Sequence, residues 1–103
     1  MQTSYLSLNV DVNKAYHQAD TMAKCADGML QQSKKLSDCA NEILSHWRGN
    51  TAAAYARKLE ALANELSANA KQCLADATAF RARIDAVREA EEKARSIIER
   101  QME

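Results

Sequence analysis

A seven-residue spacing of apolar residues constrains the fold of this chain more than any other feature. In the first half, one row takes every seventh residue, and the row three places further along is also apolar. The first row is Val12, Ala19, Ala26, Ser33, Ala40 and Trp47, and the second is Ala15, Met22, Met29, Leu36 and Ile43. A repeat of this length places both rows on one stripe of an α-helix and lets two helices pack along it.

The second half of the chain repeats this pattern. One row is Leu59, Leu66, Cys73, Phe80, Val87 and Ala94, and the row beside it is Leu62, Ala63, Ala70, Ala77, Ile84 and Ile98. Composition favours helix throughout, because the chain has no Pro and only two Gly. The sequence therefore predicts an all-α fold.

The one clear break in the pattern lies between the two halves, at Gly49. Glycine readily takes the left-handed backbone conformation that ends a helix, and Asn50 or Thr51 can cap the next helix with a side-chain oxygen. A connection this short makes the helices antiparallel. We therefore predict one domain, 1–103, with a helix over 11–46, a turn at 47–50 and a second helix over 51–100.

The first residues allow two interpretations. The stretch "LSLNVDV" alternates as a strand or an extended arm would, although Tyr5, Leu8 and Val12 also continue the heptad spacing. We expect an extended arm before Asp11, which would act as the N-cap. Because the second predicted helix is the longer one, it should extend past the first at its C-terminal end.

A lone hairpin of two helices has one thin apolar layer, which rarely stabilises a chain of this size. We therefore expect it to dimerise into a four-helix bundle, with a second copy or with a different helical chain. The large apolar residues predicted to form the dimer or partner interface are Met22, Met29, Leu30, Leu36, Ile43, Leu44, Leu59, Leu62, Leu66, Phe80 and Ile84.

Charge and hydropathy argue against several classes of partner. Fourteen basic residues balance fourteen acidic ones, so the surplus of positive charge that nucleic acids and anionic membranes attract is missing. No apolar run approaches the roughly 20 residues that span a bilayer, and the first residues do not form a secretory signal peptide. We expect synthesis in a cytoplasm, no nucleic-acid partner and no stable membrane insertion.

The reactive side chains form no pattern typical of an enzyme. Cys39 and His46 share a helix face, but two turns separate them by about 10 Å, too far for nucleophile and base. Two His and three scattered Cys do not have metal-ligand spacing, and no Gly-rich phosphate loop is present. We therefore predict no catalytic, metal or cofactor site, and reduced thiols rather than a disulfide framework.

The only Trp stands two residues before Gly49, followed by the run "NTAAAY". On packing alone, the Trp47 side chain would cover the end of the hydrophobic core that lies at the turn. The motif Trp47-Arg48-Gly49 at the midpoint of about one hundred residues, between two amphipathic helices, also resembles the WXG family. This family comprises the early-secretory-antigenic-target-like small substrates of bacterial type VII secretion, and the resemblance covers essentially the whole chain.

The resemblance implies a helical hairpin that forms a dimeric four-helix bundle and is exported already folded by the type VII secretion ATPase. The protein would then be made in the bacterial cytoplasm and secreted to the extracellular space or the cell surface. In the family, Trp and Gly shape a notch at the turn, which the partner's C-terminal tail reaches. By that matching, Trp47 and Gly49 form the export and partner-binding motif.

The chain departs from the family pattern in its tail. Family tails carry Tyr-x-x-x-Asp/Glu, whereas no Tyr follows Tyr55 here, and the only similar pattern is Tyr16 to Asp20 within the first helix. Either the signal is degenerate or a partner supplies it, and the second option suggests a targeting partner for the helical leader of a larger toxin. The alternative function is an intracellular coiled-coil adaptor or chaperone unrelated to secretion.

Overall fold

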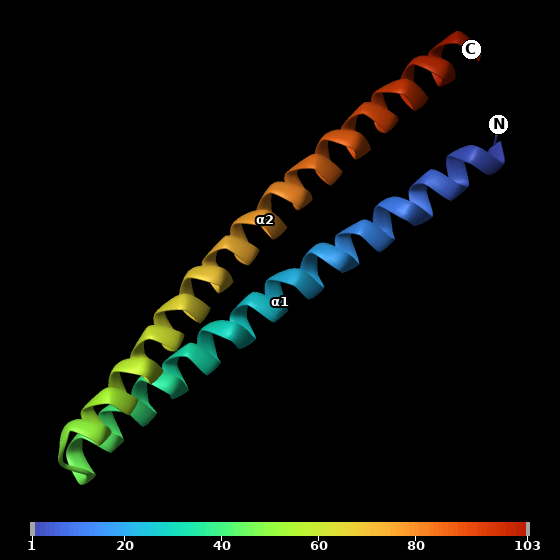
Figure 1. Cartoon of the computed structure of the whole chain (residues 1–103). Coiled ribbons are helices and arrows are strands. Elements are labelled where there is room, and N and C mark those ends of the chain that lie inside the picture. The colour runs from blue at the N-terminus through green and yellow to red at the C-terminus, as the bar shows by residue number, and fades with distance from the viewer. Residues whose placement is uncertain (1, 103) are drawn as a thin grey trace.

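The computed structural model describes the backbone of residues 2–102 and the side chains of residues 11–102. Within this part, the chain forms two long α-helices, α1 (Gln2–His46) and α2 (Asn50–Met102), and no strand. The helices run antiparallel and are joined at one end by the turn at 47–49 (Figure 1). The resulting rod measures 81 × 17 × 14 Å, and the predicted all-α hairpin is confirmed.

The beginning of α1 differs from the sequence prediction. The expected extended arm is wrong, because α1 already begins at Gln2 and Asp11 lies in its interior rather than at its N-cap. The first ten residues contain neither Pro nor Gly, so nothing in their backbone chemistry stops a helix. With 45 residues in α1 and 53 in α2, α2 is longer by eight residues, which is about 12 Å at 1.5 Å per residue.

The contact between the helices runs along a central row of mostly small residues spaced by seven. The row consists of Val12, Ala19, Ala26, Ser33 and Ala40 on α1, and Ala56, Ala63, Ala70, Ala77 and Ile84 on α2. All of these are buried, whereas no large side chain within residues 11–102 is fully buried. Small side chains at the contact let two helix axes approach closely, so bulkier residues must lie beside the row.

Two hydrogen bonds between the helices fix the register. The Ser33 hydroxyl donates to the carbonyl oxygen of Ala63 at 2.6 Å, and the Cys73 thiol donates to the carbonyl oxygen of Met22 at 3.7 Å. Both donors reach the backbone of the opposite helix, which requires the two backbones to lie close together. The bond from Ser33 also satisfies the one polar side chain that is buried in the central row.

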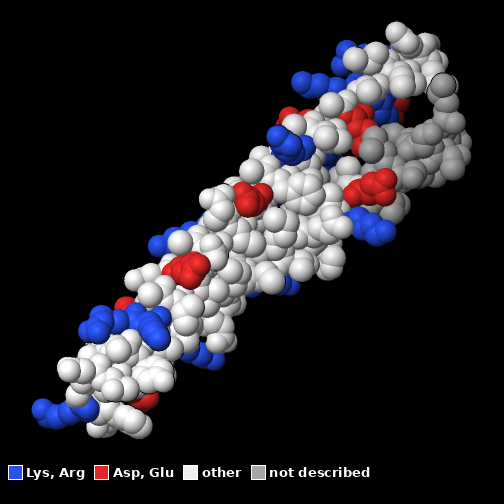
Figure 2. Space-filling view, viewed as in Figure 1, with Lys and Arg blue, Asp and Glu red and all other residues white. Residues whose placement is uncertain are grey.

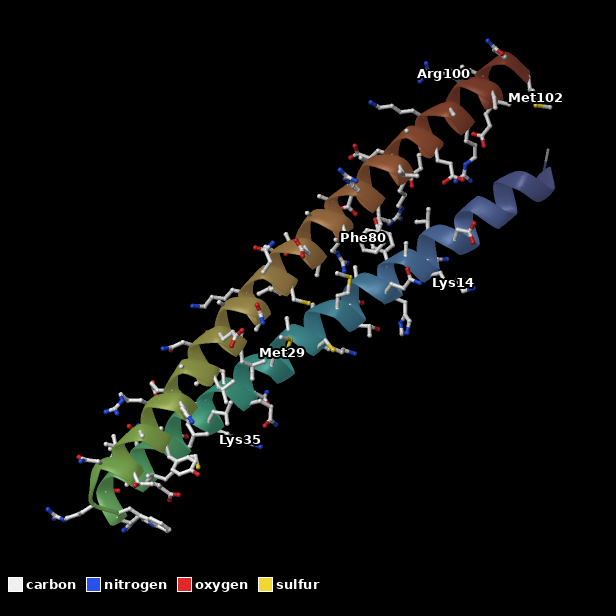
Figure 3. All side chains as sticks on the ribbon, in the orientation of Figure 1. Lys14, Met29, Lys35, Phe80, Arg100 and Met102 are labelled. Atoms are coloured by element: carbon white, nitrogen blue, oxygen red, sulfur yellow. The ribbon has the colours of Figure 1, made fainter. Side chains whose placement is uncertain are left out.

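The larger apolar contacts between the helices gather toward the termini. Val12, Ala19 and Ile84 form a buried cluster, against which Tyr16 and Phe80 pack. In Figure 3, Phe80 projects from α2 toward α1, whereas Arg100 points away from the opposite helix. The core therefore passes from Ala-sized residues along most of the rod to larger ones near the open end.

The close approach of the helices predicts a strong size limit at Ala70, which is completely buried. Ala70→Leu should destabilise the protein by about 1–3 kcal/mol, because the added side chain must push the helices apart. Ala68→Leu, on the exposed side of the same helix, should change the free energy of unfolding by less than about 0.5 kcal/mol. Urea unfolding followed by circular dichroism measures both, and equal tolerance of the two leucines would contradict close packing.

Candidate interaction surface and turn motif

The residues beside the central row form two different flanks of the rod. Residues three places after each buried residue lie on one flank, and those four places after it lie on the other. Because the helices are antiparallel, the row three places after the buried residues of α1 lies on the same flank as the corresponding row of α2. The two rows four places after the buried residues share the other flank. We call the first the apolar flank: Ala15, Met22, Met29, Leu36 and Ile43 from α1, with Leu59, Leu66, Cys73, Phe80 and Val87 from α2.

Two shallow grooves confirm that these rows meet. One is lined by Leu36 of α1 together with Leu62, Glu65, Leu66 and Asn69 of α2. The other, nearer the termini, is lined by Asp11, Val12, Ala15, Phe80, Arg83, Ile84 and Val87. Each groove joins the apolar row of α1 to that of α2, so the two rows lie side by side at both places.

The edges of the apolar flank carry little charge. The residues just before the buried positions form these edges: Asp11, Gln18, Cys25, Gln32 and Cys39 on α1, and Tyr55, Leu62, Asn69, Asp76 and Arg83 on α2. Between the turn and Asn69 these two rows carry no ionised group, although Glu65, three residues after Leu62, lines one of the grooves. Figure 2 shows one face of the rod, on which an uncharged band runs between scattered acidic and basic side chains.

The opposite flank, which we call the polar flank, is held by hydrogen bonds and charges. Near the turn, the Ser37 hydroxyl donates to the Glu60 carboxylate at 3.1 Å. Near the open end, the Arg81 guanidinium donates to Asp20 at 2.9 Å. Arg81 also lies 5.1 Å from the centroid of the Tyr16 ring. Polar contacts between α1 and α2 therefore already occupy much of this flank.

Tyr16 is the centre of the contacts at the open end. Its hydroxyl donates to a carboxylate oxygen of Asp85. This hydrogen bond raises the pKa of the Tyr16 phenol above its usual value, because the carboxylate favours the protonated hydroxyl, while Arg88 acts in the opposite direction. Tyr16 thus connects the two helices within the hairpin.

The predicted interface residues divide between these surfaces. Most lie on the apolar flank or at its edge: Met22, Met29, Leu36, Ile43, Leu59, Leu62, Leu66 and Phe80. Leu30 and Leu44 instead belong to the row on the polar flank. Ile84 is only 5% exposed and belongs to the core between the helices, so it offers no free surface. Tyr55 and Val87, which the sequence prediction omitted, are exposed and lie on the apolar side.

Gly49 forms the turn as predicted. Its φ of 109° is a conformation that residues with a Cβ rarely adopt. The Trp47 amide donates to the Ile43 carbonyl at 2.9 Å, and the Ala53 amide donates to the Gly49 carbonyl at 3.1 Å. Gly49 therefore takes the capping position of α2, and the predicted side-chain cap by Asn50 or Thr51 is wrong because both lie within the helix.

Trp47 does not plug the core. Its side chain is 69% exposed, because α1 ends at His46 and the chain turns away from the seam at this point. Tyr55 and Leu44 are also largely exposed near the turn. Tyr55 lines a shallow groove together with Asn50, Thr51, Ala54 and Lys58. Trp is enriched at the contact sites of protein–protein interfaces, so an indole this exposed is a candidate contact for another protein.

Other kinds of site are not apparent in the described part. Among the side chains of residues 11–102, no group of three or more His, Cys, Asp or Glu could hold a metal ion. All three Cys are free thiols. Neither described helix has an apolar stretch long enough to cross a membrane. No protein-family model, curated protein or solved structure matches the chain, so the likeness to the WXG family rests on the features described above.

The two glycines predict opposite responses to the same substitution. Gly49→Ala should lower the free energy of unfolding by about 1–2 kcal/mol, because alanine is strained at positive φ. Gly28→Ala should raise it by up to about 1 kcal/mol, because Gly28 lies within α1 and a methyl group there meets no atom within 4 Å. Urea unfolding curves of both variants test this, and stabilisation by Gly49→Ala would contradict the turn geometry.

Proposed function

We propose that this protein acts by protein–protein binding, with the apolar flank packed against a second helical hairpin in a four-helix bundle. The observation that carries this proposal is the contrast between the flanks. Both rows of the apolar flank are apolar apart from the weakly polar thiol of Cys73, whereas the polar flank contains Glu60, Arg81 and Arg88 in the matching row of α2. A long apolar surface with weakly charged edges is a recognised sign of an interaction site.

The thin core of the hairpin supports the same proposal. The helices bury mainly alanines against each other, and the larger side chains, such as Met29 and Leu66, are only half-buried. Burial of apolar area is the main favourable contribution to folding, so a second layer on this flank would supply what the hairpin lacks.

We further propose that the hairpin belongs to a bacterial type VII secretion system, as a WXG-type protein. Three features support this: about one hundred residues, a two-helix hairpin, and Trp47-Arg48-Gly49 at its turn. The protein would be exported folded as a dimer, or would target a larger toxin by pairing with its helical leader. Because the tail lacks Tyr-x-x-x-Asp/Glu, the second role accounts for the missing signal by placing it on the partner.

Two exposed leucines of α2 allow a matched test of the interface. Leu62 is 52% exposed at the edge of the apolar flank, and Leu74 is 43% exposed in the row on the polar flank. Leu62→Glu should abolish dimerisation at micromolar concentration, because a dimer would bury its charge. Leu74→Glu should leave the dimer intact.

Sedimentation velocity measures the mass of both variants, and circular dichroism confirms that each remains helical. A wild-type protein that sediments as a well-folded monomer would contradict the proposal. So would a Leu62→Glu variant that dimerises as well as the wild type.

The exposed indole predicts a secretion phenotype without unfolding. Trp47→Ala should stop the protein from appearing in the culture medium of the native bacterium, while the purified variant keeps nearly full stability because Trp47 packs little. Leu44→Ala, which removes another apolar side chain that is exposed near the turn but belongs to the row on the polar flank (Leu44 is 56% exposed), is the control and should still be secreted. Wild-type protein that is never found outside intact cells would favour an intracellular adaptor.

A further inference from the structure

Two of the three thiols lie at the middle of the rod on its apolar side. Cys25 is exposed at the α1 edge of the apolar flank, one residue from the midpoint of α1. Cys73 is half-buried in the α2 row. Its bond to the Met22 carbonyl places it level with Met22, which is only about 4.5 Å along the axis from Cys25. Cys39 lies on the same edge as Cys25, but about 21 Å nearer the turn.

This placement has a consequence for any symmetric pair of hairpins joined through their apolar flanks. A two-fold axis lies in the contact plane, either along the rod or across it. In the first case α1 of each copy faces α2 of the other, so Cys25 comes level with Cys73 of the second copy. In the second case like helices face each other, so Cys25 meets Cys25 and Cys73 meets Cys73. In both arrangements, two fully overlapping copies place a thiol of one copy within about one helical turn, measured along the rod, of a thiol of the other copy.

We propose that the occupant of the apolar flank is a second copy of this chain, and that oxidation joins the two copies by a disulfide through Cys25 or Cys73. The inference rests on the proposed function in that it needs the apolar flank to be the contact. A second copy suits the flank because the rows just before the buried residues carry no charge between the turn and Asn69, so few like charges meet when two copies pack together. A zero formal net charge also removes overall repulsion between copies.

The bond forms by thiol–disulfide exchange with a low-molecular-weight disulfide, such as oxidised glutathione. The thiolate of one copy attacks that disulfide, forms a mixed disulfide and releases one small thiolate. The thiolate of the second copy then attacks the mixed disulfide and releases the other. The two protein thiols lose two protons and two electrons in total, and the small disulfide is reduced to two thiols. The interface holds the thiols near each other, which raises their effective concentration.

The chain provides its own control for this proposal. The Cys39→Ser variant retains both central thiols and should form disulfide-linked dimer with oxidised glutathione at the rate of the wild type. The Cys25→Ser/Cys73→Ser variant retains only Cys39, which has no thiol at its level in either arrangement. It should cross-link more slowly by about tenfold or more. Non-reducing gel electrophoresis measures both rates, and sedimentation velocity confirms that every reduced variant is a dimer.

Two further variants report the orientation of the copies. Cys39→Ser/Cys73→Ser leaves Cys25 alone, and Cys25→Ser/Cys39→Ser leaves Cys73 alone. If like helices face each other, at least one of these variants should cross-link by itself. If α1 faces α2, neither should, and an equimolar mixture of the two should give the linked dimer. Either pattern supports the proposal.

Failure of the proposed interface and failure of the proposed disulfide give different experimental results. A reduced wild-type protein that sediments as a monomer would overturn both the proposed interface and the disulfide. A reduced dimer whose Cys39→Ser variant gives no linked dimer would overturn the disulfide alone. The same conclusion would follow if Cys39 by itself cross-linked as fast as the central thiols. It would also follow if mass spectrometry found a disulfide within one chain.

Discussion

The close approach of the two helices along their central row determines how the rest of the molecule is organised. Because Ala26 and Ala70 are fully buried and Ser33 reaches the backbone of α2, no space remains for bulky side chains between most of the two helices. Methionine, leucine and phenylalanine side chains therefore lie beside the contact rather than within it. The hairpin gains a defined register from its small residues, but it leaves much of its large apolar surface on the outside.

The two sides of the central row then take different roles. On one side, Tyr16, Asp85 and Arg81 connect the helices, and Ser37 with Glu60 does the same near the turn. On the other side, the rows carry no polar group beyond the weak thiol of Cys73. Hydrogen bonds between the helices stabilise the first side without a partner, whereas the second side gains most when another apolar surface covers it. This asymmetry is what makes one face the candidate interface.

Much of the fold could be predicted from the spacing of residues along the chain. The seven-residue repeat indicated two helices, and Gly49 marked the turn, because both depend on local backbone chemistry. The start of α1 was missed because the alternation in "LSLNVDV" is also compatible with a helix. The exposure of Trp47 was missed because the seven-residue spacing places Trp47 in the buried row, whereas α1 ends at His46 and the chain turns away from the seam at Trp47.

The division into flanks is the main feature that the seven-residue spacing alone does not resolve. Leu30 and Met29 are neighbours on α1, and both fit a broad apolar stripe, so they were assigned to one interface. Only the antiparallel arrangement shows that the row of Leu30 shares its flank with Glu60 and Arg81. The signal was nevertheless present in the sequence, since the row three places after each buried residue is apolar throughout and the row four places after it is mixed.

The dependence of thermal unfolding on protein concentration tests the central claim most directly. If a second copy completes the fold, dissociation accompanies unfolding, and mass action raises Tm as the protein is concentrated. We expect Tm, followed by circular dichroism between about 1 and 100 μM, to rise steadily with concentration. A Tm that stays constant over this range, with a cooperative transition, would show that the hairpin is complete by itself and would contradict this account.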